Sequence, residues 1–163
     1  MISNKWVLSA AHCFRGVSNI STIKVFLRAH NLGSFTYSID YNNTEVYWVE
    51  EVLLHPDYED DQSIDLALLK LNKSVDFARF KDIRPICLPP RKSTKMFAGE
   101  DAIAAGWGRN DPNQQIGKLA PILLEKDVKV VTNDQCLNQN STKWTICTTY
   151  GACAGDSGDI RTK

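Results

Sequence analysis

The chain has 163 residues, of which 43% are hydrophobic, so it can bury a core of the size expected for a folded domain. Nineteen Lys and Arg side chains balance nineteen Asp and Glu side chains, which excludes an overall charge that would hold the protein on nucleic acid or on an anionic membrane. No apolar run approaches the roughly 18 residues of a membrane span, and residues 1–7 lack the pattern of a signal peptide. We therefore expect neither nucleic acid nor a membrane as a partner.

Short runs rich in β-branched and aromatic residues predict β-strands along the whole chain. The first is an apolar strand within Trp6–Cys13, and the others cover residues 22–27, 45–54, 65–71, 101–107 and 122–131. Turn-forming clusters separate them at residues 31–34, 41–44, 55–61 and 110–115. The one helical signal is the capping-box spacing of Thr132 and Gln135, which predicts one or two helical turns. This pattern is typical of an all-β barrel or sandwich.

A proline-rich segment divides the chain into two β units. Residues 84–95 hold three prolines among basic side chains, a composition that cannot continue a central strand and suits a connector. We predict an N-terminal unit over residues 1–88, and a C-terminal unit with its connector over residues 89–163.

The five cysteines match no zinc-binding spacing, so a disulfide framework is the better interpretation of Cys13, Cys87, Cys136, Cys147 and Cys153. A metal-binding protein built on Cys and His stays open as a weaker alternative. The odd number of cysteines requires a free thiol, an intermolecular bond or missing sequence. Four Asn-x-Ser/Thr sequons, candidates for glycosylation, begin at Asn19, Asn42, Asn72 and Asn140 and favour a secreted, extracellular protein.

Three side chains have the chemistry of a hydrolytic site, although each is ambiguous alone. His12 ends an apolar strand, where a hydrogen-bonded structural histidine would also fit. Asp65 begins another apolar strand, and a carboxylate there needs a partner. Ser157 lies between glycines in Gly-Asp-Ser-Gly, a sequence that a β-turn would also explain.

The sequence segments that contain these residues, taken together and in order, indicate a protein family much more specifically than any one of them. In chain order the sequence has Trp-Val-Leu-Ser-Ala-Ala-His-Cys at 6–13, Ile-Asp-Leu-Ala-Leu-Leu at 64–69, Pro-Ile-Cys-Leu-Pro at 85–89, Ala-Gly-Trp-Gly at 105–108 and Gly-Asp-Ser-Gly at 155–158. Over residues 2–158 the chain thus resembles the chymotrypsin family of serine proteases, and the local string around Cys147 is similar to arthropod chymotrypsin-like members. The resemblance implies two six-stranded antiparallel Greek-key β-barrels, both incomplete in this chain.

The resemblance also implies a role for each side chain. Ser157 would attack the peptide carbonyl, His12 would act as general base and then acid, and Asp65 would orient the imidazole. The backbone N–H groups of Gly155 and Ser157 would form the oxyanion hole. Gly151 would lie at the base of the substrate pocket, and because it is uncharged it favours chymotrypsin- or elastase-like over trypsin-like cleavage.

Further expectations come from the same resemblance. Cys136 would pair with Cys147, which leaves Cys13, Cys87 and Cys153 without partners. Asp156 would pair with the ammonium group of an activated N-terminus. We find no such segment and expect the chain to be truncated at both ends, and inactive as the 163-residue polypeptide.

The chemistry of this triad needs no cofactor, and Ala29 replaces the glutamate with which many relatives begin a calcium loop, so no metal is expected. The expected partners are a protein or peptide substrate and protease inhibitors. A non-catalytic protease homologue that acts as a binding or regulatory module is the alternative. Because all three triad residues are present, the catalytic interpretation is favoured.

Overall fold

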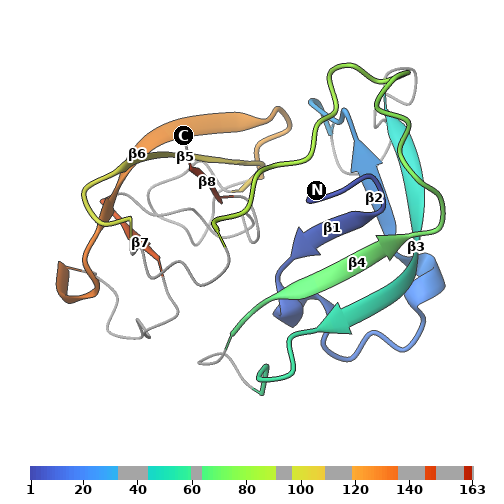
Figure 1. Cartoon of the computed structure of the whole chain (residues 1–163), viewed down its shortest axis with the longest axis horizontal. Coiled ribbons are helices and arrows are strands. Elements are labelled where there is room, and N and C mark those ends of the chain that lie inside the picture. The colour runs from blue at the N-terminus through green and yellow to red at the C-terminus, as the bar shows by residue number, and fades with distance from the viewer. Residues whose placement is uncertain are drawn as a thin grey trace. The chain divides into compact units, whose positions relative to one another are not determined.

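The computed structural model describes residues 1–32, 44–59, 64–90, 97–108, 119–135, 146–149 and 160–162 (Figure 1). The chain divides into two compact units, Met1–Arg91 and Lys92–Lys163. Each unit contains one four-stranded antiparallel sheet. Among the described residues no helix has the length and hydropathy of a membrane span.

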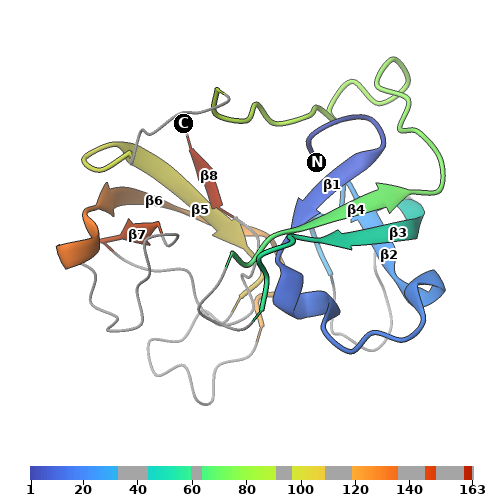
Figure 2. The ribbon, with the colours of Figure 1, turned by 60° about the horizontal axis from the view of Figure 1, so that its bottom comes forward.

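The sheet of the first unit has the strand order β1-β4-β3-β2, with β1 at Trp6–Ser9, β4 at Ala67–Leu71, β3 at Glu45–Leu54 and β2 at Lys24–Leu27. The ten-residue strand β3 pairs with β2 over its first half and with β4 over its second half. Because β3 pairs first with β2 and then with β4, the sheet curls into half of a barrel (Figure 2).

The concave side of this sheet carries the apolar core of the first unit. Strand β4 alternates as the period of a strand requires, with Ala67, Leu69 and Leu71 buried and the residues between them partly exposed. The central cluster consists of Tyr47, Leu71, Val75, Phe80 and Ile83, against which Met1, Val7, Val25, Leu27 and Phe77 pack. Leu71 has no exposed surface, so it lies at the centre of this core.

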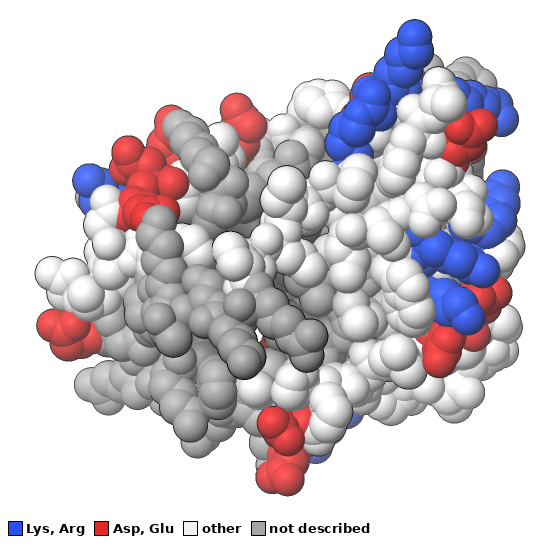
Figure 3. All heavy atoms as spheres, in the orientation of Figure 1, with Lys and Arg blue, Asp and Glu red and all other residues white. Residues whose placement is uncertain are grey.

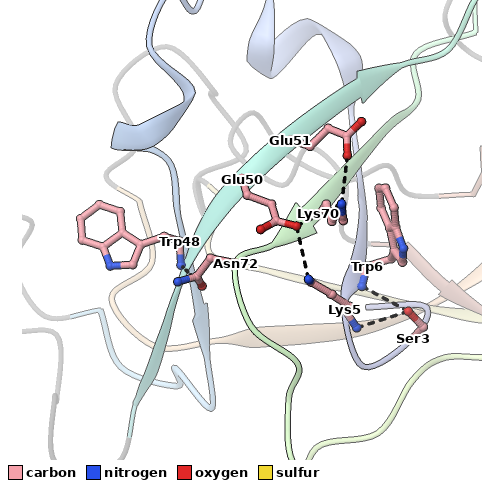
Figure 4. Close-up of polar contacts among 8 residues, drawn as sticks. All are labelled: Ser3, Lys5, Trp6, Trp48, Glu50, Glu51, Lys70 and Asn72. Atoms are coloured by element: carbon pink, nitrogen blue, oxygen red, sulfur yellow. Dashed lines mark hydrogen bonds and ion pairs between the residues drawn. The ribbon is translucent and has the colours of Figure 1, made fainter.

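An ion-pair network crosses the other side of the same sheet (Figure 4). The register of β3 shifts between Val49 and Glu51, and the bulge puts the consecutive carboxylates of Glu50 and Glu51 within reach of one cation. Lys70 Nζ lies 3.1 Å from Glu50 and 3.4 Å from Glu51, and Lys5 Nζ lies 3.3 Å from Glu50. These groups are partly exposed, so the network adds little to stability but satisfies the charges on the surface. Figure 3 shows basic and acidic side chains lying beside one another on the visible face of this unit.

Two side chains in Figure 4 fix the ends of strands by accepting backbone hydrogen bonds. Ser3 Oγ accepts from the N–H groups of Lys5 and Trp6 at the start of β1. Asn72, the residue after β4, accepts the N–H of Trp48 on its Oδ1 and donates its own N–H to the Trp48 carbonyl. These bonds fix the start of β1 and the end of β4, at the end of this antiparallel pair opposite to the one that His12 and Asp65 adjoin.

The sheet of the second unit has the strand order β7-β6-β5-β8, with β7 at Cys147–Thr148, β6 at Leu124–Val131, β5 at Asp101–Gly106 and β8 at Ile160–Thr162. Its core is a smaller cluster of Ala102, Val128 and Val130, with Phe97 and Ala104 packed against it. Strand β8 begins three positions after Ser157 in the sequence, and it pairs with β5.

The prediction of an all-β fold is confirmed, and the strand over residues 45–54 is predicted with its observed limits. The strand predicted over residues 65–71 begins at Ala67, because the backbone of Leu66 bonds to Ile64 and to His55 instead of continuing the β1 ladder. The helical turn predicted after Thr132 is a short 3-10 helix, η3 (Asn133–Gln135), and the Gln135 side chain accepts hydrogen bonds from Thr132. The strands β7 and β8 were not predicted, because two or three residues carry too little pattern.

Candidate active site

His12 lies in a short 3-10 helix, η1 (Ala11–Phe14), that follows β1. The two small residues before it are buried, Ala10 at 7% and Ala11 at 0% exposure. A larger side chain at Ala11 would not fit this site without displacing its neighbours. The buried alanines anchor the backbone, and the His12 side chain is 43% exposed and accessible from solvent.

Asp65 lies two residues before β4, and β4 is the strand adjacent to β1. Ser9 and Ala67 are opposite each other in the antiparallel pair. Because the two strands run in opposite directions, the residues after Ser9 and those before Ala67 leave the sheet at the same end. Strand pairing therefore brings together His12 and Asp65, which are 53 positions apart in the sequence.

Both carboxylate oxygens of Asp65 bind His12. Oδ2 lies 2.6 Å from the ring nitrogen Nδ1, and Oδ1 accepts the backbone N–H of His12 at 2.8 Å. The contact with Nδ1 fixes the plane of the imidazole, and the contact with the backbone N–H fixes the Asp65 carboxylate against the backbone of His12. The resemblance implied this pair, whereas the backbone hydrogen bond has no signal in the sequence.

The charge of Asp65 determines which nitrogen of His12 carries a proton. Burial raises the pKa of Asp65, but hydrogen bonds from the ring and backbone of His12, the charge of His12 and the backbone of Ala11 lower it, and the result is a pKa below the ordinary 3.8. The carboxylate is therefore ionised at neutral pH and can only accept a hydrogen bond. Nδ1 of the neutral ring must then carry the hydrogen, which leaves the lone pair on Nε2 as the base.

The neighbouring thiol of Cys13 contacts that base: Sγ lies 3.5 Å from His12 Nε2. Burial, and then the negative charge of Asp65, raise the pKa of Cys13 above its ordinary value of 9.0. The thiol is therefore neutral at physiological pH and acts as a weak donor to Nε2. Adjacency to His12 was visible in the sequence, but which ring nitrogen the sulfur contacts was not.

The other predicted site residues lie outside the described part of the chain: Gly151, Gly155, Asp156 and Ser157. The structure thus brings together two of the three predicted triad residues, His12 and Asp65.

Cys147 is disulfide-bonded, and its predicted partner Cys136 lies outside the described residues, as does Cys153. Cys13 and Cys87 are free and exposed. Of the sequons, Asn19 and Asn72 are exposed, and Asn42 and Asn140 are outside the described residues. Within the described ranges, no three His, Cys, Asp or Glu side chains form a group that could hold a metal ion.

The sequence model of the Trypsin family matches residues 1–159 of this chain. Among curated proteins, the chain is 34% identical to a venom protease of Bombus pensylvanicus, with 95% of this chain and 63% of that protein covered. It is 30% identical to ovochymase of Halocynthia roretzi and to coagulation factor XI of Bos taurus, in each case over 97% of this chain. The matched regions are 10% and 25% of those two proteins, so the chain spans less than two thirds of these relatives.

A mutant of human heparin-binding protein has the same fold, with a TM-score of 0.78, 24% identity, and coverage of 99% of this chain and 68% of that one. The curled half-barrel and the second sheet correspond to an incomplete double barrel of the chymotrypsin type, which confirms the predicted architecture. The chain belongs to the Trypsin family of serine proteases.

Proposed function

We propose that the protein is a serine endopeptidase in which Ser157, His12 and Asp65 form the catalytic triad. The observation that carries the proposal is the bidentate contact of Asp65 with the ring and backbone of His12. It orients the imidazole so that, in the neutral ring, the basic nitrogen Nε2 faces away from the carboxylate. An imidazole prepared in this way can take the proton of a serine hydroxyl, which is otherwise a poor nucleophile.

The proposed reaction has two halves. Ser157 Oγ forms a bond to the peptide carbonyl carbon while its proton passes to His12 Nε2, and the imidazolium is stabilised by ionised Asp65. The C–N bond then breaks, and the amine leaves with the proton from Nε2. Water attacks the resulting acyl-enzyme, gives one proton to Nε2 and releases the acid, and the proton returns to Ser157.

Two further groups would stabilise the negative charge of the intermediate. The N–H groups of Gly155 and Ser157 form the proposed oxyanion hole, and removing one such donor costs about 3 kcal/mol of transition-state stabilisation. Asp156 would pair with the ammonium group of an N-terminus released by activation. The pair would hold the Gly155–Ser157 backbone in a shape in which both N–H groups point at the oxyanion.

The proposal is tested by labelling the full-length, activated gene product with a fluorophosphonate, which reacts with an activated serine. We expect stoichiometric labelling of the peptide that contains Ser157, and none in Ser157→Ala. His12→Ala should label far more slowly, because no base then takes the hydroxyl proton. Folded protein that does not label, but binds another protein equally well before and after Ser157→Ala, would favour a non-catalytic binding module instead.

We expect the residue at the proposed base of the pocket, Gly151, to determine which substrate side chain is preferred. Because the base of the pocket has no carboxylate, cleavage after aromatic or other apolar residues should dominate in a peptide library. Introducing the charge with Gly151→Asp should raise the relative rate after Arg and Lys. A wild-type enzyme that already prefers Arg or Lys would show that Gly151 does not lie at the base of the pocket.

The proposed location is extracellular, and the proposed partners are protein or peptide substrates and protease inhibitors. The matched relatives include venom proteases and a coagulation factor, whose names describe proteins that act outside the cell. The four sequons fit this location.

A further inference from the structure

The sequon at Asn19 lies in a turn whose hydrogen bonds are local, beside strand β3. Asn19 precedes the 3-10 helix η2 (Ile20–Thr22), and its Oδ1 accepts hydrogen bonds from the backbone N–H of Ser21 at 3.0 Å and from the Ser21 hydroxyl at 2.6 Å. The hydroxyl and N–H of Thr22 donate to the Asn19 carbonyl. Every hydrogen bond of Asn19 is therefore made within three residues of it.

The amide nitrogen of Asn19 is available in this turn. All of its side-chain hydrogen bonds use Oδ1, the residue is exposed, and its neighbours Val17 and Ile20 are 38% and 37% exposed. A group attached to Nδ2 would extend into solvent without removing any hydrogen bond that holds the turn.

The sequon at Asn72 is exposed as well, but it is tied to distant parts of the chain. Asn72 makes two hydrogen bonds to Trp48, one through Oδ1 and one through its backbone N–H (Figure 4). Three residues later, the Val75 N–H donates to the Asn4 carbonyl at 2.7 Å, and the Val75 side chain is buried in the core. The Asn72–Ser74 segment is thus held at both ends by contacts with β3 and with the start of the chain.

We propose that Asn19 is a site of N-linked glycosylation and that it is occupied in preference to Asn72. The inference requires that the chain enter the secretory pathway, as the proposed function does, but not that it be a peptidase. The donor is a lipid-linked oligosaccharide pyrophosphate. A bond forms between Asn19 Nδ2 and the anomeric carbon, the bond from that carbon to the pyrophosphate oxygen breaks, and the amide gives up one proton.

The difference between the two sites lies in the hydrogen bonds that the oligosaccharide-transferring enzyme must break to bind each sequon. An enzyme that holds the sequon in its own active site has to displace only local hydrogen bonds at Asn19, which can reform within the same turn. At Asn72 it must act before β3 and β4 pair, or must break contacts between segments 24 positions apart. Folding therefore closes the Asn72 site and leaves the Asn19 site open.

The experiment uses the chain in a Ser157→Ala background, so that occupancy is read independently of peptidase activity. A heterologous signal peptide directs it into eukaryotic cells, and a C-terminal tag carries a reporter sequon. Molecules that a lectin captures through the glycan on the reporter sequon have all been exposed to the glycosylating enzyme. Enzymatic deglycosylation in heavy-oxygen water then marks each formerly occupied Asn for peptide mass spectrometry.

We expect most captured molecules to be marked at Asn19 and a minority at Asn72. Ser21→Ala should abolish the mark at Asn19, and Ser21→Thr should retain it. Destabilising the β3–β4 pair with Leu71→Ala should raise occupancy at Asn72 and leave Asn19 unchanged. Captured molecules without a mark at Asn19, or with Asn72 marked as often as Asn19, would overturn the proposal.

Discussion

Asp65→Asn in the activated enzyme is expected to lower kcat by about 10⁴-fold, the size of effect that this substitution has in the serine protease triad. The backbone N–H of His12 requires an acceptor and binds Oδ1 at 2.8 Å, so the asparagine oxygen should occupy that position. Its NH₂ group then faces Nδ1, where Asp65 Oδ2 lies 2.6 Å away in the native chain. Nδ1 becomes the acceptor, the ring proton moves to Nε2, and the base is lost although the geometry is retained.

A second Asp→Asn change in the same unit provides the control. Asp82 accepts a 2.7 Å hydrogen bond from Arg28 Nε and is distant in sequence from both triad residues of this unit. Asp82→Asn removes a similar surface charge and should leave kcat within about twofold of the native value, because exposed pairs contribute little. A kcat for Asp65→Asn that stays within tenfold of the native value would contradict the proposed role of Asp65.

Leu71→Ala is expected to destabilise the first unit by about 2–5 kcal/mol, the range for truncating a fully buried leucine. Leu71 has no exposed surface and lies in the cluster with Tyr47, Val75 and Phe80, so the removed atoms leave a cavity that rigid neighbours on several elements cannot fill. The measurement is urea unfolding followed by tryptophan fluorescence. The loss of stability is read from the shift of the urea midpoint, provided that the dependence of the unfolding free energy on urea concentration is unchanged.

The matched control for this prediction is Leu53→Ala. Leu53 lies in β3, next to β4, but its side chain is 43% exposed. The same truncation should cost about 1 kcal/mol or less there, because Leu53 already has a large part of its surface in water and its truncation leaves no closed cavity. Equal losses at Leu53 and Leu71 would show that the described core does not carry the stability of the unit.

The local sequence was sufficient for the elements that are long and alternating. The strand over residues 45–54 is rich in Val and aromatic residues over ten positions, so neither its type nor its limits depended on the rest of the chain. The types and order of His12, Asp65 and Ser157 within their motifs were likewise sufficient to predict the class of protein, which the family match then confirmed.

Other features required the tertiary structure, because they depend on pairing between distant segments. β7 and β8 contain two and three residues, and such short strands form only where a neighbouring strand offers hydrogen bonds. The bulge that brings Glu50 and Glu51 to the same lysine follows from the register of β3 against β4, which no local pattern specifies.

The same division holds for the site. The residue types alone tell which groups can do the chemistry, because a base, a carboxylate and a hydroxyl are defined by residue type. Only the antiparallel pairing of β1 with β4 decided that His12 and Asp65 meet, and only the backbone of η1 decided that both carboxylate oxygens bind His12 and that the Cys13 thiol contacts Nε2. Distances of this kind depend on strand register and on buried anchors such as Ala11, which are set by contacts across the whole unit and not by neighbouring residues.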